Sequence, residues 1–261
     1  MGSLNVTPDS FSDGGQYPTV QEAVDRGCLM VDEGADIVDI GGESTRPGAI
    51  EVDVDEEIAR ILPVVTALRA CSPVCISIDT RKAEVARRAL AAGADIINDV
   101  SALTHDPRMA DLAATSGAGV VLMHMRGDPQ RMQENPQYDD VVGEVRDYLE
   151  DRLRVCERVG VSREACVVDP GIGFGKTCEH NLALLAGLGE LAHLGRPVLV
   201  GLSRKSFLGQ ATGRGTDDRL AAGLGAHAAA VMNGASVLRV HNVKETCDAI
   251  GIVDMLAERR P

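Results

Sequence analysis

The feature that most restricts the fold of this chain is a regular alternation of short apolar runs with longer helical patterns. The short runs are rich in Val, Ile and Ala, and a polar residue closes each of them. This alternation is typical of parallel strands that are joined by crossover helices. We predict eight strands, at Gly2–Val6, Asp36–Ile40, Val74–Ile78, Asp95–Ile97, Gly119–Met123, Ala165–Val168, Pro197–Leu202 and Ser236–Val240.

The segments between these runs have apolar residues three and four positions apart, which predicts helices. The clearest helices are expected at Val20–Glu33, Asp53–Arg69, Lys82–Ala92, Tyr138–Val159 and Thr216–Asn233. Gly34, Gly93 and Gly234 each stand between a helix and the following strand. Glycine suits the left-handed position just past a helix end, so these residues indicate a repeated helix-to-strand turn.

Eight strand–helix units in 261 residues, with no break in composition, predict one domain that spans residues 1–261. A (β/α)₈ TIM barrel takes about 250 residues, so the expected fold is an α/β barrel with its active site at the C-terminal ends of the strands. The alternative is a doubly wound open sheet. Such a sheet normally has a glycine-rich phosphate loop after its first strand, and Val6-Thr7-Pro8-Asp9 is not one.

The charge and cysteine content restrict the partners. A net charge of -13 repels phosphate backbones and anionic lipid, so we expect neither nucleic acid nor a membrane surface as partner. An anionic small molecule requires a local cluster of cations. Seven cysteines without a CxxC pair indicate reduced thiols. No basic leader with an apolar core opens the sequence and no apolar run nears 18 residues, so we expect a cytoplasmic protein.

Hydrogen-bonding or charged residues follow all eight predicted strands. In a barrel these residues converge on one rim, whereas the opposite connections, such as 92–94, are nearly featureless here. A single Asp after a strand is more often a helix cap or turn former than a functional residue. Eight polar strand ends on one rim nevertheless favour an active site.

The polar rim divides into two chemical sets. Carboxylates, an amide and an ammonium group suit a flat heterocycle with adjacent N–H groups, and these are Asp79, Asn98, Asp169 and Lys205. Hydroxyl and cationic groups suit a diphosphate, and these are Ser44, Thr45, Arg46, Arg239 and His241. Ser206 opens a helix, where it is either a plain cap or a partner for a carboxylate.

Eight segments resemble motifs of the dihydropteroate synthase family and together cover essentially the whole chain. The two longest run from Leu4 to Gly15 (LNVTPDSFSDGG) and from Asp39 to Gly48 (DIGGESTRPG). The others begin at Ser77 (SIDT), Asn98 (NDVS), Met123 (MHM), Asp169 (DPGIGFGK), Ser203 (SRKSFLG) and Arg239 (RVHNV).

The resemblance implies a role for each matched residue. Asn5 is expected to help hold Mg²⁺ on the diphosphate. The expected pterin diphosphate site is Thr45, Asp79, Asn98, Met123, Asp169, Lys205, Arg239 and His241, among which Asp79, Lys205, Arg239 and His241 are expected to act in catalysis. The expected p-aminobenzoate site is Phe11, Arg46, Pro47, Phe174 and Ser206.

The implied activity is that of a transferase of folate biosynthesis. It would join 6-hydroxymethyl-7,8-dihydropterin diphosphate to p-aminobenzoate, giving 7,8-dihydropteroate and pyrophosphate. Because an arylamine nitrogen is already nucleophilic, we expect departure of the leaving group to come first. A folate-dependent methyltransferase and a non-catalytic pterin-binding protein are the alternatives. The resemblance also implies a homodimer, through the small-residue segment 220–233.

Overall fold

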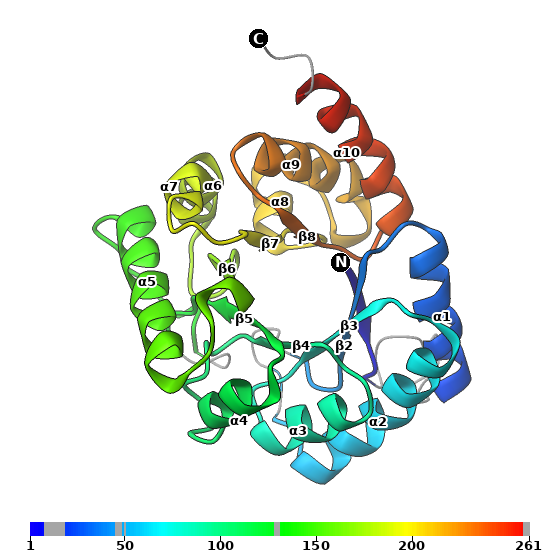
Figure 1. Ribbon diagram of the computed structural model, residues 1–261. Helices are drawn as coiled ribbons and strands as arrows, with labels where there is room; N and C mark the ends of the chain where they lie inside the picture. Colours follow the sequence, from blue (N-terminus) through cyan, green and yellow to red (C-terminus); the bar gives the residue numbers. More distant parts are fainter. Residues whose placement is uncertain (8–18, 45–48, 50, 128–130, 258–261) are drawn as a thin grey trace.

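Figure 1 shows the computed structural model, in which a ring of strands is surrounded by helices. The structure describes residues 1–7, 19–44, 49, 51–127 and 131–257. Six parallel strands pair in sequence order: β1 (Gly2–Asn5), β2 (Ile37–Gly41), β3 (Cys75–Asp79), β4 (Ile96–Asp99), β5 (Gly119–Met123) and β6 (Cys166–Asp169). Two further strands, β7 (Leu199–Gly201) and β8 (Val237–Arg239), pair with each other in parallel.

Two parallel bridges join these sheets at both edges. Val168 bridges to Val198 between β6 and β7, and the Val168 N–H donates to the Pro197 carbonyl at 3.0 Å. Gly2 bridges to Val240 between β1 and β8, and the Ser3 N–H donates to the Val240 carbonyl at 2.8 Å. The eight strands therefore form one (β/α)₈ barrel, and the open-sheet alternative is wrong.

Helices cover the outside of the barrel (Figure 1). They are α1 (Val20–Asp32), α2 (Val54–Cys71), α3 (Ala83–Ala91), α4 (Met109–Ser116), α5 (Val141–Val159), α6 (Cys178–Ala186), α7 (Leu188–Ala192), α8 (Ser206–Thr212), α9 (Leu220–Met232) and α10 (Val243–Ala257). The glycines at 34, 93 and 234 have φ of 103°, 109° and 109°, which confirms the predicted left-handed turns after α1, α3 and α9. In the described part of the chain, no helix combines the length and the apolarity needed to cross a membrane.

The eight strands and the five named helices lie where the sequence predicts them, apart from their boundaries. Two predicted helices are too long at their N-terminal ends. The helix expected from Tyr138 begins at Val141, because the Asp140 carboxylate caps it and the Tyr138 hydroxyl instead donates to the Gly175 carbonyl at 2.9 Å. The helix expected from Thr216 is interrupted: a 3₁₀ turn covers Thr216–Asp218 and α9 begins at Leu220.

The core lies between the strands and the helices. On β5, Val120 and Leu122 are fully buried in one cluster with the α5 residues Val145, Leu149 and Leu153. Such aliphatic residues contribute about 1.5–3 kcal/mol each when they are fully buried. This packing fixes the strands, and it leaves their C-terminal ends to hold polar groups.

Candidate active site

The ends of the first four strands place polar side chains in one layer. Asn5 is paired with Gly41 across β1 and β2, Gly41 with Asp79 across β2 and β3, and Asp79 with Asn98 across β3 and β4. A Cβ at Gly41 would lie in van der Waals contact with this layer, 3.4 Å from Asp79 Cβ and 3.8 Å from Asn5 Oδ1. The lack of a side chain at Gly41 therefore leaves space between Asn5 and Asp79.

Arg239 at the end of β8 holds two carboxylates. Its Nε donates to Asp39 Oδ2 at 2.6 Å and its Nη2 donates to Asp79 Oδ2 at 2.8 Å. The Asn98 amide donates to both Asp39 oxygens, at 3.2 and 3.3 Å. Asp39, a fully buried residue with no predicted role, thus joins Arg239 to Asn98, and Arg239 in turn binds Asp79.

Asp79 keeps one oxygen for a ligand. Its Oδ1 is buried and has no hydrogen-bond partner among the described residues. Burial raises the pKa of Asp79 to about 7; the Arg239 guanidinium opposes this increase and the Asp39 carboxylate adds to it. A buried oxygen without a donor is costly, so this atom is suited to accept an N–H group from a bound molecule.

A second pair of charges lies at the ends of β6 and β7. Asp169 Oδ1 accepts from the Gly171 N–H at 2.7 Å, and burial raises the pKa of this carboxyl against the opposing effect of Lys205. Lys205 Nζ donates to the Ile172 carbonyl and lies 4.7 Å from the centre of the Phe174 ring. Burial lowers the pKa of Lys205 to about 8, and Asp169 opposes that decrease.

Met123 and Phe174 lie beside this second pair. Met123 is buried and pairs with Asp169 across β5 and β6. Phe174 is half-buried, and its N–H donates to the Gly171 carbonyl at 3.0 Å. Residues predicted for the pterin therefore lie beside Phe174, which is predicted for p-aminobenzoate.

The remaining predicted residues fall into two groups. His241 follows β8, with its Nδ1 3.0 Å from Ser203 Oγ, and Ser206 is the exposed first residue of α8, where Lys205 occupies the cap position. Four of the predicted residues lie outside the described part of the chain, namely Phe11, Thr45, Arg46 and Pro47.

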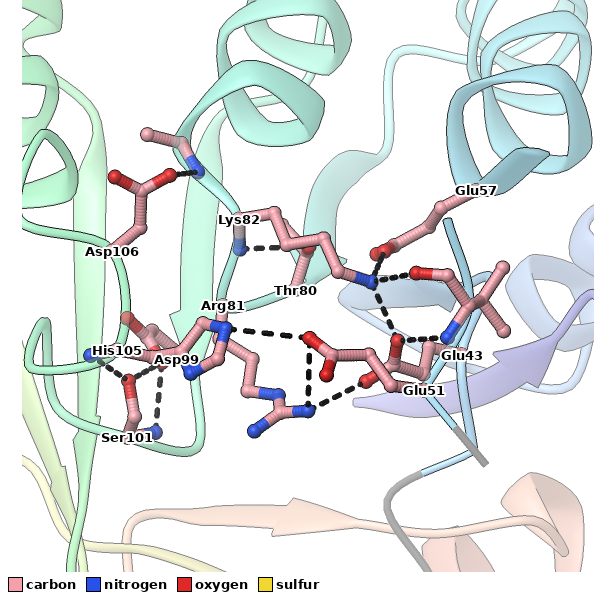
Figure 2. A network of polar contacts seen from close by, with 12 residues as sticks. Glu43, Glu51, Glu57, Thr80, Arg81, Lys82, Asp99, Ser101, His105 and Asp106 are labelled. Atoms are coloured by element: carbon pink, nitrogen blue, oxygen red, sulfur yellow. Dashed lines mark hydrogen bonds and ion pairs between the residues drawn. The ribbon is translucent and has the colours of Figure 1, made fainter. Parts of the chain in front are cut away.

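A buried ion cluster that the sequence analysis did not identify lies after β2 and β3 (Figure 2). Lys82 Nζ donates to Glu43 at 2.5 Å, to Glu57 at 2.6 Å and to the Val52 carbonyl at 2.6 Å. The Val52 N–H donates to the same Glu43 carboxylate at 2.8 Å. Glu43 and Val52, near the two ends of the segment between β2 and α2, are thereby joined. Glu57 has a sequence signal, because a charged residue there lies on the same buried face of α2 as Ile61 and Leu68.

Comparison with known proteins identifies the family of this chain. The chain matches the family described as pterin binding enzyme over residues 1–241. It is 49% identical to the dihydropteroate synthase of Escherichia coli K12 over 254 residues, covering 97% of this chain and 90% of that enzyme.

Solved structures give the same relationship. A Xanthomonas albilineans dihydropteroate synthase with 4-aminobenzoic acid matches with a TM-score of 0.93 and 48% identity, over 100% of this chain and 93% of that one. A structure from the same organism in complex with 7,8-dihydropteroate matches with a TM-score of 0.90 and 45% identity, over the same shares. The chain therefore belongs to the pterin-binding enzymes and, among them, to the dihydropteroate synthases.

Proposed function

We propose that this chain joins 6-hydroxymethyl-7,8-dihydropterin diphosphate to p-aminobenzoate in folate biosynthesis, releasing pyrophosphate. The observation that carries the proposal is the buried polar set at the strand ends, above all the Oδ1 of Asp79, which has no partner in the described part of the chain. The related enzymes bound to 4-aminobenzoic acid and to 7,8-dihydropteroate support the same pair of substrates. A folate-dependent methyltransferase and a non-catalytic binder are disfavoured by the match to synthases over almost the whole chain.

The pterin ring would bind to Asp79, Asn98, Asp169 and Lys205. A pterin presents adjacent N–H groups and a carbonyl, which complement two carboxylates and an ammonium group. The bond between the pterin methylene carbon and the diphosphate oxygen then breaks, and the electron pair leaves with the diphosphate. Asp79 and Asp169 stabilise the positive charge that develops on the ring.

The arylamine nitrogen of p-aminobenzoate then attacks the methylene carbon and loses a proton to solvent. Phe174 would pack against the aromatic ring, and the exposed Ser206 would meet the carboxylate. Phe11, Arg46 and Pro47 are proposed for the same site. Thr45 and His241 are proposed for the diphosphate. Arg239 is proposed for the pterin and the diphosphate, and its guanidinium is held by Asp39 and Asp79.

Magnesium is proposed to bind with the diphosphate, and Asn5 is the residue that would hold it. The fit rests on the Asn5 side-chain oxygen, which lies at a strand end beside the space kept open by Gly41. Among the described residues, no three His, Cys, Asp or Glu side chains form a metal cluster. This agrees with Mg²⁺, which keeps several waters and takes few protein ligands when phosphate oxygens are present. The ion would neutralise charge on the leaving group.

The proposed cytoplasmic homodimer rests on two other observations. All seven cysteines are free, as expected in a reducing compartment. Adjacent helices α9 and α10 expose large apolar side chains, namely Leu220, Met232, Ile252, Met255 and Leu256. Burial of such a surface against a second copy would stabilise a dimer. Light scattering at micromolar concentration should give twice the chain mass, and a monomer would refute the proposal.

The activity is tested by turnover with both substrates and Mg²⁺. We expect equimolar formation of 7,8-dihydropteroate and pyrophosphate, which stops when either substrate or Mg²⁺ is omitted. Binding of the pterin without any product would favour the non-catalytic alternative. Asp254→Asn, a change on the outer helix α10, is the control for protein quality.

A further inference from the structure

The segment after β6 lies directly against the segment after β5. Gly171 and Gly175 have φ of 66° and 65°. A Cβ at Gly171 would lie 1.9 Å from the His124 carbonyl oxygen, and one at Gly175 would lie 2.5 Å from the Arg126 carbonyl oxygen. Only glycine allows this conformation and this close approach, so residues 170–176 lie flush against residues 124–126.

Lys176 ends this segment, with its ammonium group enclosed between the two segments. The residue as a whole is only 3% exposed. Its Nζ lies 2.9 Å from His124 Nδ1, 3.4 Å from the His124 carbonyl and 3.0 Å from the Phe174 carbonyl. No carboxylate of the described residues forms an ion pair with it, whereas the equally buried Lys82 has two. Burial lowers the pKa of Lys176 to about 7, against the opposing effect of Asp169.

His124 is suited to accept a hydrogen bond from Lys176. Burial, together with the nearby Lys176, lowers the pKa of His124 to about 3, so the ring is neutral at physiological pH. The ring is packed edge-on against Tyr148, with 4.9 Å between centroids. A neutral imidazole with its proton on Nε2 leaves Nδ1 as an acceptor, so Lys176 is the donor.

The position of Phe174 follows from these bonds. Lys176 binds the Phe174 carbonyl, while the Phe174 ring faces the ammonium group of Lys205. An alkyl side chain would fill this space without the desolvation cost of a buried ammonium group. Packing alone therefore does not explain a lysine at this position. What the ammonium adds is a fixed distance between His124 and Phe174.

We propose that Lys176 is a positioning residue for p-aminobenzoate: by binding His124 and the Phe174 carbonyl together, it holds the Phe174 ring in place beside Lys205. The inference rests on the proposed function, since it assigns Phe174 to the p-aminobenzoate site. Among the described residues, Lys176 forms no hydrogen bond with an expected pterin residue, so its loss should affect the two substrates unequally.

The test is the Lys176→Met variant of the full chain, with steady-state kinetics for each substrate at saturation of the other. We expect the KM for p-aminobenzoate to rise about tenfold or more, which corresponds to about 1.4 kcal/mol. The KM for the pterin diphosphate should change less than twofold. Lys244→Met removes an exposed lysine of α10 and is the matched control, with no change in either constant expected.

His124→Phe keeps a ring against Tyr148 but removes the Nδ1 acceptor, and it should show the same selective increase. This variant also decides the question if Lys176→Met does not fold. A p-aminobenzoate KM within twofold of the Lys244→Met value in either variant would overturn the proposal, as would an equal rise in both KM values. Absence of turnover in the wild-type protein would instead refute the proposed function.

Discussion

On the β1–β4 side of the rim the charged side chains form ion pairs with one another, whereas on the β5–β7 side they bind main-chain groups and, in the case of Lys176, also the neutral ring of His124. Arg239 contacts Asp39 and Asp79 directly, and Lys82 contacts Glu43 and Glu57. On the other side, each of Asp169, Lys176 and Lys205 takes hydrogen bonds from or gives them to the segment 171–174.

The β1–β4 side of the rim is therefore expected to be pre-formed, whereas the β5–β7 side depends on the segment 171–174. Ion pairs between strand ends are fixed by the barrel, so the β1–β4 side should keep its geometry without a ligand. The charged groups on the β5–β7 side keep their positions only as long as the segment 171–174 keeps its conformation. The rigid side therefore carries Asp79 and Asn98, which are predicted for the pterin, whereas residues 170–176 set the position of Phe174, which is predicted for p-aminobenzoate.

The largest effect is expected from Arg239→Met. Loss of the guanidinium leaves Asp39 and Asp79 buried without a cation, and breaking such a buried pair costs about 3–5 kcal/mol. Urea unfolding should show this loss of stability, and turnover should fall at least about a hundredfold, equivalent to about 2.7 kcal/mol. A variant as stable as wild type would show that the ion cluster does not hold this side together.

Asp169→Ala should abolish pterin binding with little effect on folding. Among the described residues, Asp169 accepts a main-chain hydrogen bond and forms no ion pair. Its removal therefore breaks no buried ion pair, and the fold should remain stable. Pterin N–H groups left without an acceptor cost about 1–3 kcal/mol, and more if the carboxylate is charged. Calorimetry that finds wild-type affinity for the pterin would mean that the pocket is wrongly assigned.

The pH dependence of stability gives a separate prediction, which concerns Asp79 alone. Its pKa rises from 3.8 to about 7 on folding, so the folded state holds a proton that the unfolded chain releases. This contribution is complete below about pH 4 and is lost as the pH rises to about 7. Asp79→Asn lacks it, so the stability of the variant relative to wild type should increase between pH 4 and 7. A constant difference over that range would contradict the raised pKa.

The strand-end residues could be predicted from the sequence, because the strand period and the barrel rim together bring polar residues such as Asp79 and Asp169 to one place. Asp39 was missed because it lies inside an apolar run that reads as core. The Lys82 cluster and the Lys176 bridge were missed for another reason. Each joins residues 25 or more positions apart, and only the packed structure shows that such residues meet.

The linkage between the two substrates tests the central claim, that strand ends pre-form the pterin side while the p-aminobenzoate site also needs loops. Among the residues predicted for p-aminobenzoate, Phe174 is bound by Lys176 through its carbonyl. Phe11, Arg46 and Pro47 lie outside the described residues, in segments 9–15 and 41–48 that we expect to gather around the diphosphate. Titrating p-aminobenzoate by calorimetry, with and without pyrophosphate and Mg²⁺, measures the coupling directly. We predict sharply weaker binding without the anion and, because coupling is reciprocal, tighter pyrophosphate binding at saturating p-aminobenzoate. Equal affinities with and without pyrophosphate would contradict the account.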